Sequence, residues 1–227
     1  MKTCWMIPEI TVVSATAFRI NSHARAIQQT LKALPISARG LLISSERPTI
    51  PFDEDWVSIE PSLLKNGLWT REDYSWFILS ELVSHIKTRF CIIVQWDGFA
   101  LNKDRWTDEF LNYDYIGAPW PSWMNIGRVG NGGFSLRSRK WIELSSKLLA
   151  SSPFDSPGVY GSEDCYCCKK FRHIYERAGL KIAPVSLAMN WSLEHPIEEY
   201  PGWTSDLSFG FHGFYHPSNL KHQPALE

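Results

Sequence analysis

The sequence predicts one α/β domain with a central, mostly parallel sheet flanked by helices. Short apolar runs rich in β-branched residues, such as residues 10–18 and 91–95, alternate with segments whose apolar residues recur at helical spacing. The run Ile92-Ile93-Val94 has no polar alternation, which is typical of a strand buried on both faces of a sheet. Strands that alternate with helices favour crossover connections between parallel strands.

The first half of the chain contains the repeated strand and helix units. Asn21 or Ser22 can cap the first helix, and Pro35 ends it. Thr70 begins the second helix, which feeds the central strand. The predicted elements are, in order, a strand at 10–18, a helix at about 23–34, strands at 41–43 and 56–59, a helix at about 70–86 and a strand at 91–95.

The second half has shorter elements and more glycine, proline and aromatic residues. Ser138 and Ser162 can cap helices, and Gly179 ends the second of these. Residues 151–162 are rich in proline, glycine and serine, and we expect them to form a mobile lid. We also expect the tail after Pro217 to be loose. The predicted elements are a short helix at 106–111, a strand at 113–118, a loop at 119–130, a strand at 131–137, helices at 138–149 and 162–178, and strands at 182–185, 188–193 and 209–214.

The composition excludes several classes of function. The formal net charge is −1, so the chain lacks the basic surplus of a nucleic-acid-binding protein. We see no signal peptide and no run of the ~20 apolar residues that a spanning helix needs, so we expect a cytoplasmic protein with at most peripheral contact at the inner face of a membrane. Eleven tryptophans predict a Trp-rich core, with some of them free to stack on sugar rings. Five cysteines at spacings unlike those of zinc sites predict reduced thiols.

The predicted central strand leads directly into Gln95-Trp96-Asp97-Gly98. Gly98 breaks the strand, so Asp97 lies at the carboxyl end, which is the edge where open α/β sheets bind ligands. A carboxylate at this place suits a divalent cation that carries a phosphorylated ligand. An aspartate before a glycine also caps turns, and that alternative stays open.

Three further features follow in the order Asn131-Gly132-Gly133-Phe134-Ser135-Leu136-Arg137, Ser162-Glu163-Asp164 and Phe211-His212-Gly213. Asp97 and His212 offer an oxygen and an imidazole nitrogen, a set that suits Mn²⁺. Paired glycines allow close approach of a substrate to the backbone, and a carboxylate at a helix start can take a proton from a hydroxyl group. Each feature also has a simpler explanation: a tight turn, acids that favour the helix dipole, or a structural histidine.

The ordered set resembles the motifs of the GT-A glycosyltransferases, which transfer a sugar from a nucleoside diphosphate to an acceptor. The corresponding stretches are Gln95-Trp96-Asp97 for the DxD motif, Gly132-Gly133 for the glycine-rich stretch, Ser162-Glu163-Asp164 for the xED motif and His212 for the C-terminal metal ligand. The run Gly-Gly-Phe-Ser-Leu-Arg, with Gly-Ser-Glu-Asp after it, also resembles an uncharacterised bacterial domain family related to these enzymes. The resemblance covers about residues 8–215.

The resemblance implies a GT-A-like, Rossmann-like fold in which residues 1–227 form a single domain. It implies a nucleotide-sugar-binding half at about 8–130, an acceptor-binding half at about 131–215 and a loose tail at 216–227. The implied enzyme is a hexosyltransferase of polysaccharide biosynthesis that uses Mn²⁺ or Mg²⁺. Its implied partners are a nucleotide-sugar donor, with UDP-sugars favoured, and a carbohydrate or glycolipid acceptor, joined in an inverting transfer.

The same resemblance implies roles for individual residues. Asp97 and His212 bind the metal, and Asp164 is the catalytic base. Glu163 binds an acceptor hydroxyl. The donor is contacted by Thr16 and Arg19 at the base and ribose, Gln95 at the ribose or sugar, Arg128 or Arg137 at the diphosphate, Gly132 and Gly133 beside the transferred sugar, and Trp96, Trp120 and Trp123 as stacking surfaces.

One position departs from the pattern, because Gln95 replaces the first aspartate of the DxD motif. An amide can hydrogen-bond hydroxyl groups but adds no negative charge for a cation, so we expect weaker or dispensable metal binding. Two alternatives remain: a non-catalytic carbohydrate-binding domain with a degenerate site, and a sugar nucleotidyltransferase. The second requires a glycine-rich loop after the first strand, and residues 14–19 contain no glycine.

Overall fold

A computed structural model describes residues 9–59, 69–124, 127–152 and 161–223. Its main sheet has six strands in the order β3-β2-β1-β4-β7-β6. β1 pairs in parallel with β2 and with β4, β2 pairs in parallel with β3, and β7 is antiparallel to both β4 and β6. The strands are β1 (Ile10–Thr16), β2 (Ala38–Ser44), β3 (Asp55–Ser58), β4 (Phe90–Ile93), β6 (Tyr115–Ile116) and β7 (Ser135–Ser138). The mostly parallel sheet expected from the sequence is confirmed.

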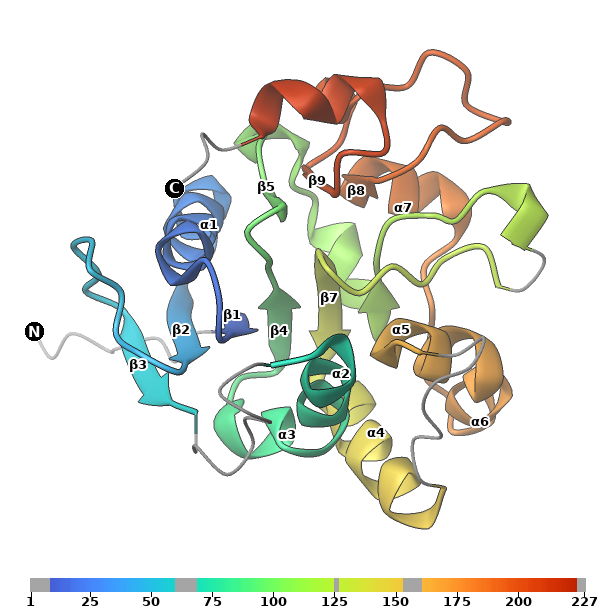
Figure 1. Cartoon of the computed structure of the whole chain (residues 1–227). Coiled ribbons are helices and arrows are strands. Elements are labelled where there is room, and N and C mark those ends of the chain that lie inside the picture. The colour runs from blue at the N-terminus through green and yellow to red at the C-terminus, as the bar shows by residue number, and fades with distance from the viewer. Residues whose placement is uncertain (1–8, 60–68, 125–126, 153–160, 224–227) are drawn as a thin grey trace, which may run out of the picture.

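Helices cover both faces of this sheet, because alternate residues of its strands face opposite sides. Ile10 and Val12 of β1 belong to one apolar core, which also holds Ile27 of α1. Val13 and Ala15 belong to a second core with the helices α2, α3 and α4 (Figure 1). The helices bounding these cores are α1 (Ile20–Ala33), α2 (Arg71–Ser80), α3 (Leu82–His85), α4 (Arg139–Ser151), α5 (Glu163–Cys165), α6 (Arg172–Arg177) and α7 (Val185–Trp191).

A small second sheet closes one end of the molecule. Its order is β5-β9-β8, with β5 at Gly98–Ala100, β9 at Gly210–His212 and β8 at Ser192–Leu193. β5 and β9 are antiparallel, with Gly98 opposite His212. This pairing joins the middle of the sequence to its last strand (Figure 1).

Several helix boundaries follow from local chemistry. Thr70 caps α2 in a capping box with Asp73, as the sequence predicts. The helix expected to continue to residue 86 is interrupted at Glu81, between α2 and α3. Arg19, in the left-handed region at φ 48°, takes the N-cap position of α1 that the sequence assigns to Asn21 or Ser22.

The prediction of a strand at 188–193 is wrong for most of these residues. Residues Val185–Trp191 form α7, because Leu187, Ala188 and Trp191 lie on one helical face that packs into the first core. Only Ser192–Leu193 is a strand, and the strand predicted at 182–185 is reduced to a bridge between Tyr115 and Ile182. A short apolar run fits either periodicity, and tertiary packing decides between them.

Three other expectations differ from the structure or lie outside it. The helix predicted at 162–178 consists of α5, a π-helical turn at Tyr166–Lys170 and α6. The predicted lid at 151–162 lies mostly outside the described residues. The tail predicted to be loose begins with a 3₁₀ helix at Pro217–His222, held by the buried amide of Asn219.

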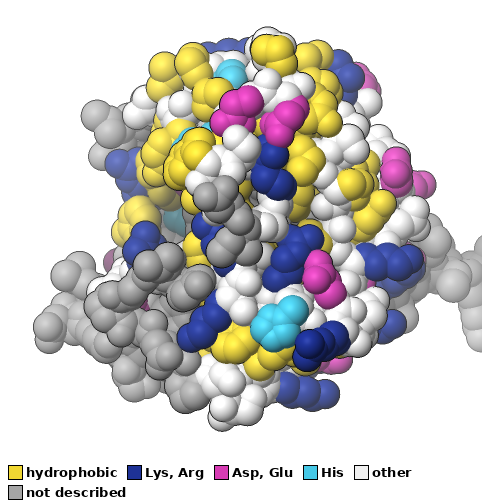
Figure 2. All heavy atoms as spheres, turned by 90° about the vertical axis from the view of Figure 1, so that its right-hand side faces the viewer, with side chains coloured by type: hydrophobic (Ala, Val, Ile, Leu, Met, Phe, Trp, Pro, Cys, Tyr) yellow, Lys and Arg dark blue, Asp and Glu magenta, His cyan; other side chains and the backbone are white. Residues whose placement is uncertain are grey.

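Figure 2 shows one face of the molecule, on which charged side chains of both signs are present. Lys and Arg side chains are scattered over its described part, with Asp and Glu side chains among them. No helix in the described ranges is both long and apolar enough to cross a membrane.

Candidate functional site

A cavity of about 300 Å³ lies at the carboxyl ends of β1 and β4. This is the edge of an open α/β sheet at which ligands bind. Its walls come from segments far apart in the sequence, so the fold brings them together. The lining residues fall within 15–18, 69–74, 95–96, 131–133 and 162–164, together with His23 and His212.

The turn between β4 and β5 places Asp97 beside His212. Gln95 and Gly98 exchange two backbone hydrogen bonds, which close the turn around Trp96 and Asp97. The pairing of β5 with β9 then sets His212 opposite Gly98, and the Gly213 N–H donates to the Asp97 carbonyl at 2.7 Å. Asp97 Oδ1 lies 3.9 Å from His212 Nε2. The convergence of these two residues, which the sequence predicts, is therefore present.

His212 is enclosed by polar groups on both ring nitrogens. Nδ1 lies 3.0 Å from Glu194 Oε1 and 2.9 Å from the Asn131 amide nitrogen. Nε2 lies 3.1 Å from Gln95 Oε1. Burial alone would lower the pKa of His212, but the hydrogen bond to Glu194 and the carboxylate charges around the ring raise it to about 9. Glu194 thus fixes the ring orientation with Nε2 toward Gln95 and Asp97.

The residues around Asp97 fit a divalent cation in part. Asp97 Oδ1 is buried and has no hydrogen-bond partner, which leaves a carboxylate oxygen available to a cation. Its neighbour Oε1 of Gln95 is an amide oxygen, which Mn²⁺ accepts. Nε2 of His212 can bind the cation only after it loses its hydrogen, because the raised pKa keeps the imidazole protonated near pH 7. The described ranges contain no cluster of three His, Cys, Asp or Glu side chains with metal-binding geometry. Further ligands for a cation would have to come from a bound diphosphate and water.

Glycine is required at positions 132 and 133 because side chains occupy the space beside them. A Cβ at Gly133 would collide with the imidazole of His212, and a Cβ at Gly132 would collide with Glu163 Oε1. The glycine pair therefore allows both side chains to reach the cavity wall.

We expect Gly133→Ala to lower the free energy of unfolding by about 1–3 kcal/mol, because the new methyl group overpacks against His212. Adding His212→Ala removes the ring with which the new methyl group collides. The double variant should therefore lose less free energy of unfolding than the sum of the losses in the two single variants. Denaturant unfolding of the four proteins measures this difference. Strictly additive losses would contradict the close approach.

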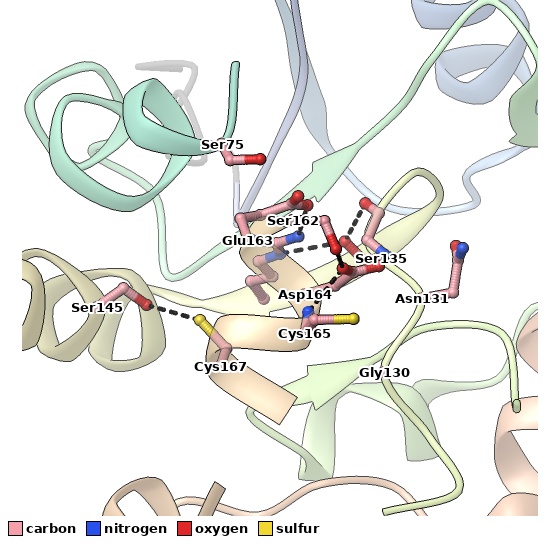
Figure 3. A network of polar contacts seen from close by, with 12 residues as sticks. Ser75, Gly130, Asn131, Ser135, Ser145, Ser162, Glu163, Asp164, Cys165 and Cys167 are labelled. Carbon is pink, nitrogen blue, oxygen red and sulfur yellow. Dashed lines mark hydrogen bonds and ion pairs between the residues drawn. The ribbon is translucent and has the colours of Figure 1, made fainter. Parts of the chain in front are cut away.

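Asp164 is held in place by hydrogen bonds on both carboxylate oxygens. The Ser162 hydroxyl and the Cys165 N–H donate to Oδ1, and the Gly132 N–H donates to Oδ2 at 3.1 Å (Figure 3). The side chain remains part of the cavity wall. Its position at the start of α5 is fixed before any ligand binds, as a preorganised base requires.

Glu163 lies deeper than Asp164. It is 4% exposed and forms an ion pair of 3.0 Å with Arg137, which is 1% exposed. Burial raises the pKa of Glu163, the charge of Asp164 raises it further, and Arg137 opposes both. The pair couples the wall of the cavity to β7.

Buried polar atoms without partners line the cavity. His23 Nε2, Trp69 Nε1 and Asn131 Oδ1 have no hydrogen-bond partner. The buried hydroxyl of Tyr74 lies on the same wall, and burial raises its pKa. Unpaired buried polar atoms are costly, so we expect these atoms to meet water or the polar groups of a ligand.

The structure brings together most of the predicted site residues. Thr16, Gln95, Trp96, Gly133, Glu163, Asp164 and His212 line the cavity. Asp97 and Gly132 contact these lining residues. Arg19 lies outside the lining, but its guanidinium covers the Trp96 ring at 4.0 Å.

Four predicted residues are not brought to the cavity. Trp120 is buried in the second core, and Trp123 is 66% exposed at a distance from the lining residues. Arg128 forms an ion pair with Glu199, and Arg137 is buried behind Glu163. The sequence shows that these residues can bind a phosphate or a sugar, but it does not show which partner each one finds.

The sequence indicates no role for several residues of the site, among them Phe18, His23, Trp69, Arg71, Tyr74, Asn131 and Glu194. A signal existed for one of them. A histidine on the apolar face of α1, beside Ala24 and Ile27, is a polar residue in a core position.

Two solved structures resemble this fold. One is described as a glycosyltransferase involved in the glycosylation of the major capsid of PBCV-1; it is 14% identical, with a TM-score of 0.53 over 95% of this chain and 98% of that chain. The other is the mannosyltransferase PcManGT from Pyrobaculum calidifontis in complex with GDP-Man and Mn²⁺; it is 9% identical, with a TM-score of 0.46 over 77% of this chain and 54% of that chain. This chain thus spans about half the length of the second protein.

The first similarity shows that the chain has the α/β fold of a glycosyltransferase structure. No curated protein matches the sequence. Residues 59–212 match the family described as "Protein of unknown function (DUF5672)", and the chain belongs to that family.

Proposed function

We propose that the protein transfers a sugar from a nucleoside-diphosphate sugar to a hydroxyl group of a carbohydrate or glycolipid, with UDP-sugars the favoured donors. The observation that carries the proposal is the cavity at the carboxyl edge of the sheet, where an unpartnered Asp97 oxygen, His212 and the oriented Asp164 meet. This set matches the chemistry that the ordered motifs imply. The fold similarity to a glycosyltransferase supports the same conclusion.

In such a transfer we assign the following roles to these side chains. Asp164 takes the proton of the acceptor hydroxyl as it attacks, in a single displacement that inverts the sugar. Asp97 and His212 would hold Mn²⁺ or Mg²⁺, which supplies positive charge for the leaving diphosphate. Glu194 orients His212, and Gln95 offers an amide to hydroxyl groups of the donor.

The proposal is tested by thermal unfolding with UDP, GDP and their sugar derivatives, with and without Mn²⁺. A ligand at 100 times its Kd stabilises the folded state by about 2.7 kcal/mol, which corresponds to a rise in Tm of roughly 5–10 °C for a chain of this size. We expect such a rise with nucleotide and Mn²⁺ together, and a smaller one with nucleotide alone.

Two variants make this test specific. Asp97→Asn should remove the part of the rise that depends on Mn²⁺. Asp206→Asn is the control, since Asp206 pairs with Lys221 at the surface and lies outside the cavity lining. Absence of any rise with every nucleotide tested, in both conditions, would overturn the proposed function.

A further inference from the structure

His23 is a cavity residue that the proposed mechanism does not use. It lies in the first turn of α1, is 3% exposed and lines the cavity beside Ala15 and Thr16 of β1. The Phe18 ring lies nearly perpendicular to the imidazole, with the ring centroids 5.8 Å apart. This part of the cavity is therefore bordered by an aromatic side chain.

The tautomer of His23 follows from its partner. Ser14 Oγ donates its only hydrogen to the Val94 carbonyl at 2.8 Å. Toward His23 Nδ1, 2.6 Å away, the same hydroxyl can only accept. Nδ1 of His23 therefore carries a hydrogen and donates it to Ser14.

The other ring nitrogen is consequently a bare acceptor. Burial, with the nearby charge of Arg19, lowers the pKa of His23 to about 3, so the ring is neutral at pH 7. Nε2 is buried and has no hydrogen-bond partner. Because the two ring nitrogens point in nearly opposite directions and Nδ1 faces Ser14, Nε2 is left to meet whatever fills this part of the cavity.

We propose that His23 selects the base of the donor nucleotide by accepting a ring N–H, so that uracil, thymine and guanine are accepted and cytosine and adenine are rejected. This inference rests on the proposed function. On the pairing edge, the central ring nitrogen of uracil, thymine or guanine carries a hydrogen, whereas that of cytosine or adenine has a lone pair. An Nε2 atom without hydrogen accepts a hydrogen bond from uracil, thymine or guanine. With cytosine or adenine, its lone pair faces another lone pair and the two repel.

A flat heterocycle fits this part of the cavity better than a sugar does. Phe18 offers an aromatic ring 55% exposed to solvent, on which a base can stack. The carboxylates that suit sugar hydroxyl groups, Glu163 and Asp164, belong to a different wall, at the start of α5.

The test compares bases of equal size. Isothermal titration calorimetry in the presence of Mn²⁺ measures the Kd of UDP against CDP, and of GDP against ADP. In each pair whose bases fit the cavity, we expect the nucleotide with a ring N–H to bind about 10- to 100-fold more tightly than the other. The other nucleotide leaves the buried Nε2 acceptor of His23 unpaired.

Variants separate the acceptor from general packing. His23→Phe keeps a ring of similar shape but no acceptor, so the ratio within each pair should fall to within about threefold. Ser14→Ala keeps the imidazole but frees its tautomer, so the ratio should fall in part. His173→Phe is the control, since His173 is exposed on α6 and should leave the ratios unchanged.

A measurement on the unaltered protein covers the case in which a variant does not fold. ¹⁵N NMR of histidine should show His23 with hydrogen on Nδ1, and its Nε2 signal should shift when UDP or GDP is added. Nucleotides that bind with equal affinity within each pair, or a preference for CDP or ADP, would overturn this inference while the proposed function stands. Absence of binding by every nucleotide overturns both.

Discussion

Asp164→Asn is expected to lower turnover by about 10²–10⁴-fold while donor binding is largely retained, because removal of a general base costs about that much. Asparagine keeps the size of the side chain and one oxygen that accepts from Ser162 and Cys165. Release of UDP from UDP-sugars measures turnover, and calorimetry with UDP measures binding. The effect should appear in kcat rather than in the Kd of the nucleotide.

The two readouts distinguish a base from a structural residue. Asp206→Asn removes a surface carboxylate and should change neither quantity. Loss of binding and of turnover in equal measure would assign Asp164 to the scaffold, because its oxygens also hold Gly132. Equal turnover of variant and parent would contradict the role of Asp164 as the base, and absence of turnover in both would favour a carbohydrate-binding domain without catalysis.

Arg137→Met is expected to lower the free energy of unfolding by about 3–5 kcal/mol, since it leaves the buried Glu163 without its cation. The guanidinium also donates to Ser135 Oγ and lies 5.3 Å from the centre of the Tyr115 ring, so both contacts are lost with it. A fall in Tm of roughly 6–20 °C follows for a chain of this size. Denaturant unfolding measures the loss directly.

A neighbouring pair provides the control for this variant. Arg139 pairs with Glu143 one helical turn away, and both side chains are partly exposed, so Arg139→Met should cost at most about 0.5 kcal/mol. Adding Glu163→Gln to Arg137→Met removes the unpaired charge and should recover part of the stability. Equal losses in the Arg137 and Arg139 variants would contradict the role of burial.

The loss in the Arg137 variant should depend on pH with a definite sign. Without Arg137 the pKa of Glu163 rises further, because burial and Asp164 already raise it and Arg137 opposes them. A carboxyl group whose pKa is higher in the folded than in the unfolded state loses stability as pH rises. The difference from the parent protein should therefore be smaller near pH 5 and larger near pH 8.

Local patterns predict the framework of this fold. The unbroken Ile92-Ile93-Val94 run predicts the buried central strand, and Thr70 marks the start of α2. Trp191 shows where such patterns stop being sufficient. Its segment is apolar and short, so the local pattern fits either a strand or a helix. The segment forms a helix because Trp191 then packs against the rings of Phe110 and Phe134.

The candidate site could be predicted to the extent that motifs mark it. Asp97, Asp164 and His212 stand in an ordered series, and the structure places them around one cavity. The partner of Arg137 is not visible in any local pattern, since Glu163 lies 26 positions away. The acceptor role of His23 depends on a hydroxyl nine positions earlier and on burial, and neither is encoded in the residue itself.

The pairing of β5 with β9 makes the site depend on residues that are synthesised far apart in time. Gln95 and His212 are 117 positions apart, so the imidazole joins the cavity only after residue 212 has been synthesised. All six strands of the main sheet precede residue 139, but Trp191 and Phe209 complete the core on one of its faces. A nascent chain stopped before β9 therefore lacks the imidazole that lies beside Asp97 and Gln95, and its site is incomplete.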